Sequence, residues 1–428
     1  MPGPKFHFSG FAPIQSLWWR HIDNIDSNRL LAVLAAAQTF LGVRVLARMA
    51  RGAGERPIVA GDDDGRPVGD ERVSVVVPAL DERDRLGPCL DGLVAQGAEV
   101  GEIVVVDGGS RDGTQGLVRA YAARDPRVRL IDASPVPDGW NGKAWGLQVG
   151  LERGGPSTEW VLTIDADVRP APGLARALLA RAREAGVPAL SVATAQEVVG
   201  LGEGLLHPAL LATVVYRFGP PGRAVRRVGD VQANGQCFLA RRDALVACDA
   251  FAVARASRCE DITVARCLVA TGHAVGFYEA EGLVAVRMYE GWRETWRNWP
   301  RSLPMRDRYT RWGSLVRLSE VVLVQAAPLP LGILLVRRLL VRRLPRPAPR
   351  SAPRAMDGWV LCPLVVNGVL ALARLGVLAG MARAYRRRPW TYWLSPLCDA
   401  PVALRLVASA VQRRHTWRGR NLIDGGTL

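Results

Sequence analysis

The amino-acid sequence predicts an α/β protein with a mostly parallel sheet covered by helices on both faces, plus membrane-associated helices at both ends of the chain. From Val73 onward, short apolar strand-like segments alternate with helical segments, and acidic residues follow several of these strands. Before and after this region stand longer apolar stretches bounded by arginines. The 428 residues are enough for one large core and additional segments.

Four strands and three helices are predicted in order in the α/β region. The strands are Ser74–Val77, Glu102–Val106, Val128–Ile131 and Val161–Ile164. The first helix follows the turn Pro78–Arg85 and continues through Val94, the second is expected to be capped by Ser110 and to stop before Pro126, and the third runs from Lys143 to Arg153. Ligands of such sheets bind outside the carboxyl ends of the strands.

The region before the first strand contains one apolar segment and a linker. Leu30–Val43 is almost wholly apolar, and Arg44, Arg48 and Arg51 follow it at helical spacing. This pattern fits a short transmembrane helix with snorkelling arginines or a helix lying in the membrane interface. We therefore expect a membrane or interfacial helix within residues 1–56, a Gly-, Asp- and Pro-rich linker over 57–72, and the α/β domain over 73–305.

Residues 306–428 are expected to form membrane-associated helices with basic loops. Three apolar stretches are present, at Val321–Val336, Trp359–Met381 and Trp390–Ala410, and arginine clusters follow all three. The positive-inside rule cannot hold for every loop if every stretch crosses the membrane. We therefore expect at least one re-entrant or interfacial hairpin, with Pro328-Leu329-Pro330 as the best candidate. The alternative is that these stretches are buried helices of a soluble domain.

The charge of the chain is concentrated at its ends. The formal net charge is +16, and residues 311–428 hold 19 arginines against 4 acidic residues, whereas the middle of the chain is close to neutral. Basic segments that bracket apolar runs indicate an anionic membrane surface, and a near-neutral body argues against nucleic-acid binding. The seven cysteines have no metal-ligand spacing and are expected to be reduced.

Two carboxylates at the end of the fourth strand are the strongest chemical signal. Asp165-Ala166-Asp167 directly follows Ile164, and such carboxylates are suitable ligands for Mg²⁺ or Mn²⁺ bound with a diphosphate. Lys143 is conspicuous because it is one of only two lysines in an arginine-rich chain. The sequence has no G-x-G-x-x-G after the first strand and no P-loop, so a dinucleotide site and a P-loop nucleotide site are disfavoured.

Six motifs, taken in order, resemble the family 2 glycosyltransferases, which have the GT-A fold. They are SVVVPALDE, EIVVVDGGSRDGT, DGWNGKAWGLQVG, WVLTIDADV, NGQCFLARRDAL and CEDITVA, and the resemblance covers Val73–Met288. The Gly-Trp-x-Gly-Lys segment, Arg287–Tyr289 and Thr416–Arg420 look like membrane-associated members that glycosylate carotenoids, hopanoids or related lipids.

The resemblance implies roles for individual residues. The donor-binding residues are Pro78, Asp81, Glu82, Asp107, Lys143 and Asp165; the metal ligands are Asp167 and Asp165; the catalytic pair is Asp261, the general base, with Glu260. The acceptor or diphosphate side is Trp140, Asn234, Gly235, Gln236, Trp299 and Arg301. The Gln-x-x-Arg-Trp box of processive relatives is absent, which argues against a polymer synthase. His207 is expected to be a core histidine whose hydrogen bonds are satisfied.

These observations together predict an inverting glycosyltransferase that uses Mg²⁺ or Mn²⁺. It would move a hexose from a nucleotide-diphosphate sugar to a terpenoid-like lipid hydroxyl, at the inner (cytoplasmic) membrane with the catalytic domain facing the cytoplasm. Two alternatives remain open at this point. One is transfer to a polyprenyl phosphate, and the other is a non-catalytic membrane scaffold with the same fold.

Overall fold

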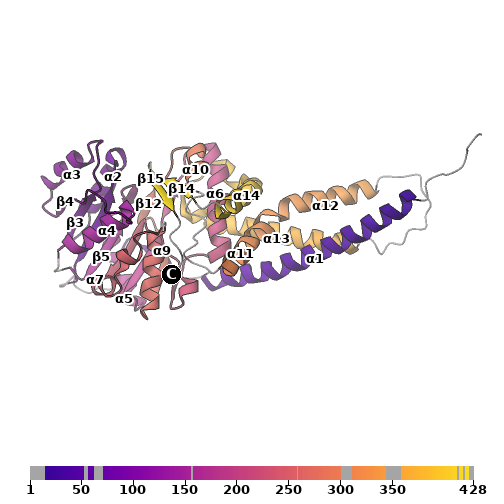
Figure 1. Cartoon of the computed structure of the whole chain (residues 1–428), viewed down its shortest axis with the longest axis horizontal. Helices are drawn as coiled ribbons and strands as arrows, with labels where there is room; N and C mark the ends of the chain where they lie inside the picture. Colours follow the sequence, from indigo (N-terminus) through magenta and orange to yellow (C-terminus); the bar gives the residue numbers. More distant parts are fainter. Residues whose placement is uncertain are drawn as a thin grey trace, which may run out of the picture.

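The protein has an α/β body and an elongated group of helices that projects from it (Figure 1). The computed structural model describes residues 15–52, 56–61, 71–155, 158–257, 259–299, 311–343, 358–411, 414–417 and 420–423. In Figure 1 the body lies at the left, and the long helices α1, α12 and α13 extend side by side to the right.

The body is built on a nine-stranded, mostly parallel sheet. Its strand order is β1-β11-β7-β10-β5-β2-β3-β4, with β9 paired to β11. The bounds are β1 Ile58–Val59, β2 Val73–Ala79, β3 Val100–Asp107, β4 Val128–Asp132, β5 Trp160–Ile164, β7 Ala189–Ala193, β9 Arg223–Val225, β10 Cys237–Arg241 and β11 Val275–Glu281. Within this sheet, β10 pairs antiparallel with β5 and β7, and β9 pairs antiparallel with β11, whereas the other described pairings of the sheet are parallel. The four predicted strands are confirmed as parts of β2, β3, β4 and β5.

Helices cover both faces of this sheet, as predicted. On one face, α2 (Arg83–Val94), α3 (Thr114–Ala122) and α5 (Leu174–Glu184) contribute to one hydrophobic core. On the other face, α4 (Gly142–Arg153), α7 (Arg242–Ala247), α8 (Ala250–Val253) and α9 (Glu260–Ala270) contribute to a second core. The central strands are buried on both sides, which explains why they read as continuous apolar runs rather than as alternating ones.

Helix α4 lies unusually close to the sheet because glycines face it. An added Cβ at Gly150 would lie 2.3 Å from Cγ1 of Val76, and one at Gly146 would lie 3.2 Å from Cβ of Pro78. No larger residue fits at Gly150 without moving the helix. This close packing sets the position of the first turn of α4, which carries Lys143, above the carboxyl ends of β2 and β5.

A small second sheet connects the body to the C-terminal region. It has the order β13-β8-β12-β6, with bounds β6 Val168–Pro170, β8 Ala195–Glu197, β12 Val284–Val286 and β13 Tyr385–Arg387. Strand β13 follows the apolar helix α13 and pairs with β8 of the body. The backbone hydrogen bonds of this sheet therefore fix the apolar helices to the domain that carries the acidic residues. A separate hairpin joins β14 (Arg414–Trp417) to β15 (Arg420–Ile423).

A third hydrophobic core lies between the body and the apolar helices. It contains residues of α1 (Gln15–Gly52), α6 (Leu201–Phe218), the π-helix η4 (Val321–Ala326), α13 (Gly358–Met381), the 3₁₀-helix η7 (Trp390–Cys398) and α14 (Asp399–Val411). Two of its helices have segments long and apolar enough to cross a membrane, Arg29–Gly52 and Trp359–Ala384. The short helix α10 (Trp292–Asn298) packs beside α6.

The helix bends at Pro328-Leu329-Pro330, the best candidate for a re-entrant or interfacial hairpin. Helix α11 (Arg311–Glu320) continues through η4 into α12 (Pro328–Arg343) with a bend of 47° between Trp312–Ala326 and Pro328–Val341. Proline is tolerated here because Pro328 begins α12, where its missing N–H would have no helical partner. Helix α12 then runs away from the body beside α13 (Figure 1), and this bent pair fits either a broken span or a re-entrant segment.

Polar side chains connect the apolar helices at the π-helix. Buried Glu320 pairs with Arg48 of α1 at 2.7 Å, and Arg48 and Arg317 also donate to the main-chain carbonyl of Arg217 at the end of α6. Within the same core, Arg374 and Asp399 form a buried pair at 2.8 Å. Because buried charges are tolerated only when they are paired, these contacts specify how the helices are arranged.

Two local expectations need correction. Ser110 does not cap α3, since the helix begins after Gly113, and the Ser110 hydroxyl instead accepts a hydrogen bond from the Asp81 main chain. The expected linker over residues 57–72 contains β1, whose Ile58 is fully buried against the sheet. The central residues of the first and third predicted helices lie in α2 and α4. Arg301 and residues 344–357 lie outside the described residues, whereas Arg386, Arg387 and Arg388 lie within them.

Candidate active site

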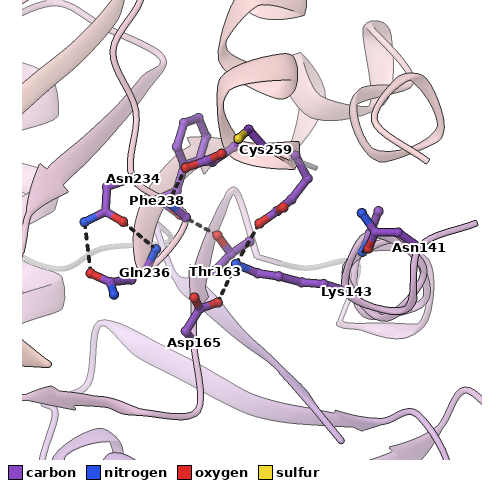
Figure 2. Close-up of polar contacts among 12 residues, drawn as sticks. Asn141, Lys143, Thr163, Asp165, Asn234, Gln236, Phe238 and Cys259 are labelled. Atoms are coloured by element: carbon purple, nitrogen blue, oxygen red, sulfur yellow. Dashed lines mark hydrogen bonds and ion pairs between the residues drawn. The ribbon is translucent and has the colours of Figure 1, made fainter. Parts of the chain in front are cut away.

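Acidic residues from two elements meet above the carboxyl end of β5 (Figure 2). Asp165 and Asp167 follow the last residue of this strand, and the Asp165 N–H donates to the Gln236 carbonyl at 3.3 Å. Glu260 and Asp261 are the first two residues of α9, where the positive end of the helix dipole favours negative charge. The antiparallel strand β10, which pairs with β5, begins at Cys237 and places Gly235 between the two acidic pairs.

Lys143 bridges the two acidic pairs. Its Nζ lies 2.7 Å from Oδ1 of Asp165 and 2.6 Å from Oε1 of Glu260, and the lysine side chain is 22% exposed. Burial on its own would lower the pKa of Lys143, but the negative charges of Asp165 and Glu260 outweigh it and raise the pKa well above its usual value. The lysine is therefore a fixed positive charge in the middle of the site.

Asp261 is held by main-chain donors and lies against an apolar cavity. Its Oδ2 accepts from Gly235 N–H at 2.7 Å and its Oδ1 from Ile262 N–H at 2.8 Å. The cavity beside it is lined largely by apolar side chains, Leu147, Phe238, Phe251 and Val264. Burial, together with the charge of Glu260, raises the pKa of Asp261 to about 7. A carboxylate with a pKa near the working pH is suited to accept a proton.

Asp167 has an open oxygen in a carboxylate-rich environment. Its Oδ1 is buried and has no hydrogen-bond partner among the described residues. Burial, followed by the charges of Asp165 and Glu82, raises the pKa of Asp167 to about 7. Five carboxyl groups thus surround this site (Glu82, Asp165, Asp167, Glu260 and Asp261), and the positive charges acting on them are those of Lys143 and Arg85.

This excess of negative charge fits a divalent cation. Within the described residues, no three His, Cys, Asp or Glu side chains are arranged to hold a metal ion without further ligands. Mg²⁺ and Mn²⁺ sites of nucleotide enzymes commonly use one or two carboxylates and take the remaining ligands from phosphate and water. The residues present therefore fit a metal ion that is bound together with a phosphorylated ligand, with Asp167 as the available carboxylate.

The other residues expected to bind a donor support the loops around the site. Asp107 is fully buried, and its Oδ2 accepts from Gly109 N–H, Ser110 N–H and the Gln115 side chain. Asp81 is exposed, has a left-handed φ of 54°, and accepts from Arg111 N–H at 2.8 Å. The β2–α2 and β3–α3 loops are thereby fixed to each other. Pro78, the penultimate residue of β2, lies beside Gly146 of α4.

The expected acceptor-side residues separate into two groups. Gly235 is in the centre of the site, where an added Cβ would lie 2.9 Å from Glu260 Oε1 and 3.0 Å from Lys143 Nζ. Asn234 and Gln236 hydrogen-bond to each other and point away from the carboxylates (Figure 2). Asn234 also donates to the Val192 carbonyl, so these two amides connect the segment before β10 to β7 in the interior of the sheet.

The expected aromatic residues lie outside the carboxylate cluster. Trp140 packs edge-to-face on Trp145, with ring centroids 5.2 Å apart. Trp299 is buried in the third core against His207, with ring centroids 4.2 Å apart. His207 itself is buried and hydrogen-bonded to the Tyr385 hydroxyl at 2.9 Å, so the expected satisfied core histidine is confirmed.

Asn141 is a site residue that the motif comparison did not single out. Its Oδ1 caps α4 by accepting from Ala144 N–H at 2.9 Å, and its Nδ2 donates to the Ser257 carbonyl at 2.6 Å. The Asn141 N–H also donates to the Arg255 carbonyl. The segment before Lys143 is therefore tied to the segment before Glu260. An asparagine directly before a predicted helix is a capping signal that could have identified it.

Comparison with known proteins gives a match to one family model and to curated relatives. Residues 74–246 match the model of Glycosyl transferase family 2. The succinoglycan biosynthesis protein ExoO of Rhizobium meliloti (strain 1021) is 35% identical over 116 residues, 27% of this chain and 30% of that protein. The lipopolysaccharide core biosynthesis glycosyltransferase LpsC of the same organism is 35% identical over 97 residues, 23% of this chain and 32% of that protein.

The matched segments span about a third of each curated relative. Among solved structures, the chain is similar to the mannosyltransferase PcManGT from Pyrobaculum calidifontis in complex with GDP-Man and Mn²⁺. The identity is 18%, the match covers 90% of this chain and 97% of that one, and the TM-score is 0.47. The family match and the strand order agree with a GT-A-like α/β fold, and the family model and relatives support a glycosyltransferase.

Proposed function

We propose that this glycosyltransferase is an inverting enzyme that moves a hexose from a nucleotide-diphosphate sugar to a lipid hydroxyl with the help of Mg²⁺ or Mn²⁺. The observation that carries the proposal is the meeting of two acidic pairs with different environments. Asp167 offers an open carboxylate oxygen next to Asp165, and Asp261 lies beside an apolar cavity with a pKa of about 7. One pair is suited to a metal ion and the other to proton transfer.

In this proposal Asp261 is the general base. Two main-chain N–H groups orient its carboxylate, and burial keeps the proton affinity of that carboxylate high. It accepts the proton of the acceptor hydroxyl as that oxygen attacks the anomeric carbon on the face opposite the leaving nucleoside diphosphate. Glu260, at the start of α9, pairs with Lys143. Asp167, together with Asp165, would hold the metal ion, which when bound would supply positive charge to neutralise the leaving diphosphate.

The apolar helices support a membrane location for the acceptor. In η7, Trp390 is 67% exposed, Trp393 50% and Leu397 60%, and the exposed Arg386, Arg387 and Arg388 precede them. Aromatic residues beside arginines are typical of a membrane interface. Helices α11 and α12 can be counted together as one bent span. With α1 and α13, this gives three spans. This number puts the body and η7 on the same side, which we propose is the cytoplasmic face of the inner membrane.

A second acceptor class is a polyprenyl phosphate. The chain also resembles a dolichyl-phosphate beta-glucosyltransferase, ALG5C, of Trichomonas vaginalis, at 37% identity over 102 residues, 22% of this chain and 28% of that protein. A phosphate acceptor is already ionised and needs no general base. The position and environment of Asp261 therefore favour a hydroxyl acceptor over a phosphate. A non-catalytic scaffold would have no use for either acidic pair.

The proposal is tested by incubating membranes that contain the protein with a panel of labelled nucleotide sugars and Mn²⁺. We expect label from one donor in the organic-extractable lipids, and none when a chelator replaces the metal. Mild acid then separates acid-labile glycosyl phosphates from stable glycosides, which distinguishes the two acceptor classes. Label that enters only water-soluble polymer would contradict the lipid assignment, and absence of any transfer would favour the scaffold.

The substitution Asp261→Asn tests the role of the base directly. We expect a loss of turnover of about 100-fold or more, because the amide cannot accept the proton, with little change in the Kd of the donor. Turnover is measured with the donor found in the panel, and donor binding by calorimetry on the purified protein. Turnover of the substituted protein at the wild-type rate contradicts the assignment.

A further inference from the structure

The bridge formed by Lys143 occupies a carboxylate that the metal motif would otherwise offer. One oxygen of Asp165 lies 2.7 Å from the Lys143 ammonium (Figure 2). The same ammonium contacts Glu260 at 2.6 Å. By contrast, the buried Oδ1 of Asp167 has no partner among the described residues. The two aspartates of the motif are therefore not equivalent before a ligand binds.

The helix does not explain the presence of Lys143. It is the second residue of α4, and a positive charge in the first turn of a helix opposes the helix dipole. Arginine is the common basic residue of this chain, and here a compact ammonium contacts two carboxylates from one stem, at 2.7 Å and 2.6 Å. The lysine therefore fits a role that depends on its contacts with Asp165 and Glu260.

The surrounding structure holds this ammonium in place. Asn141 fixes the start of α4 to the carbonyls of Arg255 and Ser257, just before Glu260. Gly235 leaves room for the bridge, since an added Cβ would lie 3.0 Å from Lys143 Nζ. The position of Lys143 is thus set by three separate segments of the body.

We infer that Lys143 is a positioning residue that holds Asp165 and Glu260 in the donor-free enzyme and leaves Asp167 as the carboxylate open to the metal ion. The inference rests on the proposed metal-dependent function and extends it. Metal binding by both aspartates requires the ammonium to release Asp165, so the lysine weakens metal binding until a donor diphosphate supplies new ligands. The bridge thereby couples metal binding to donor binding.

The test measures binding of Mn²⁺ alone to the purified full chain, by the electron paramagnetic resonance signal of free Mn²⁺. Lys143→Met keeps the length of the side chain but removes its charge. We expect donor-free Mn²⁺ to bind at least about fivefold more tightly, because Asp165 is released and a nearby positive charge is lost. Lys143→Arg keeps the charge and is expected to stay within about twofold of the wild type.

A double-mutant cycle separates release of Asp165 from a general charge effect. Asp165→Asn alone is expected to change donor-free Mn²⁺ affinity little. In the double variant Lys143→Met/Asp165→Asn, most of the affinity increase caused by Lys143→Met is expected to disappear. Unchanged Mn²⁺ affinity in Lys143→Met, with only a weaker affinity for the donor, overturns the inference. An increase in Mn²⁺ affinity that persists when Asp165 is replaced by Asn also overturns the inference. Circular dichroism checks that each variant is folded.

These outcomes are distinct from failure of the proposed function. If the wild type binds Mn²⁺ and shows the predicted cycle but transfers no sugar, the proposed function fails and the role of Lys143 stands. If the wild type transfers sugar but the cycle shows no coupling between Lys143 and Asp165, the role of Lys143 fails and the proposed function stands.

Discussion

At the residue scale, the environment of Asp261 determines how activity should depend on pH. Its pKa is raised to about 7, so the carboxyl is largely protonated at pH 6 and largely ionised at pH 8. Because the base acts only when ionised, kcat/KM should rise with pH through about 7 and fall by up to about tenfold per unit below it. The profile is measured at saturating Mn²⁺, so that protonation of Asp167 does not limit metal binding. A rate that is constant from pH 6 to 8 contradicts this role.

For the candidate active site, the sequence predicted which residues take part better than it predicted how they are arranged. Asp165, Asp167, Glu260, Asp261 and Lys143 stand in recognisable motifs, and the structure brings all five together. The contact between Lys143 and Glu260 joins residues more than a hundred positions apart, so spacing along the chain could not predict it. Asn234 and Gln236 belong to the same motif as Gly235, but their hydrogen bonds point them away from the site.

At the element scale, the position of α4 depends on Gly150. We expect Gly150→Val to destabilise the body by about 1–3 kcal/mol and to lower turnover, because the helix that carries Lys143 must move off the sheet. A matched control is Gly116→Ala in α3, where an added Cβ meets nothing within 4 Å. The control should be neutral or stabilising by up to about 1 kcal/mol. Thermal unfolding and turnover are measured on both variants, and equal behaviour of the two contradicts the packing argument.

Elements with a strong local pattern were predictable, whereas those fixed by distant partners were not. Strands β2, β3 and β5 were predictable because their sequences are continuous apolar runs. Helix α4 was predictable from its apolar spacing and its capping residues. Strand β13 is three residues long and forms only because β8 of the body is available to pair with it. The prolines at Pro328 and Pro330 predicted a break in the apolar stretch, but the contacts of α12 with α13 are not visible in the sequence of α12.

At the scale of the whole molecule, the proposed three spans would place the end of α12 across the membrane from the body. We expect a membrane-impermeant maleimide to label V246C in sealed vesicles with the cytoplasmic face outward, and V341C only after the vesicles are opened. Both positions are exposed, and the exposed Cys362 is first replaced by serine. Labelling of both cysteines from the same side would mean that α11 and α12 form a re-entrant hairpin.

The central claim is that Asp261 takes a proton from a lipid hydroxyl during an inverting transfer. The most direct measurement is nuclear magnetic resonance of the lipid product formed by the purified protein from its identified donor. We predict a glycoside on an alcohol oxygen whose anomeric configuration is opposite to that of the donor, and no such product from the Asp261→Asn variant. A product with retained configuration, or a sugar linked to phosphate, would contradict the claim.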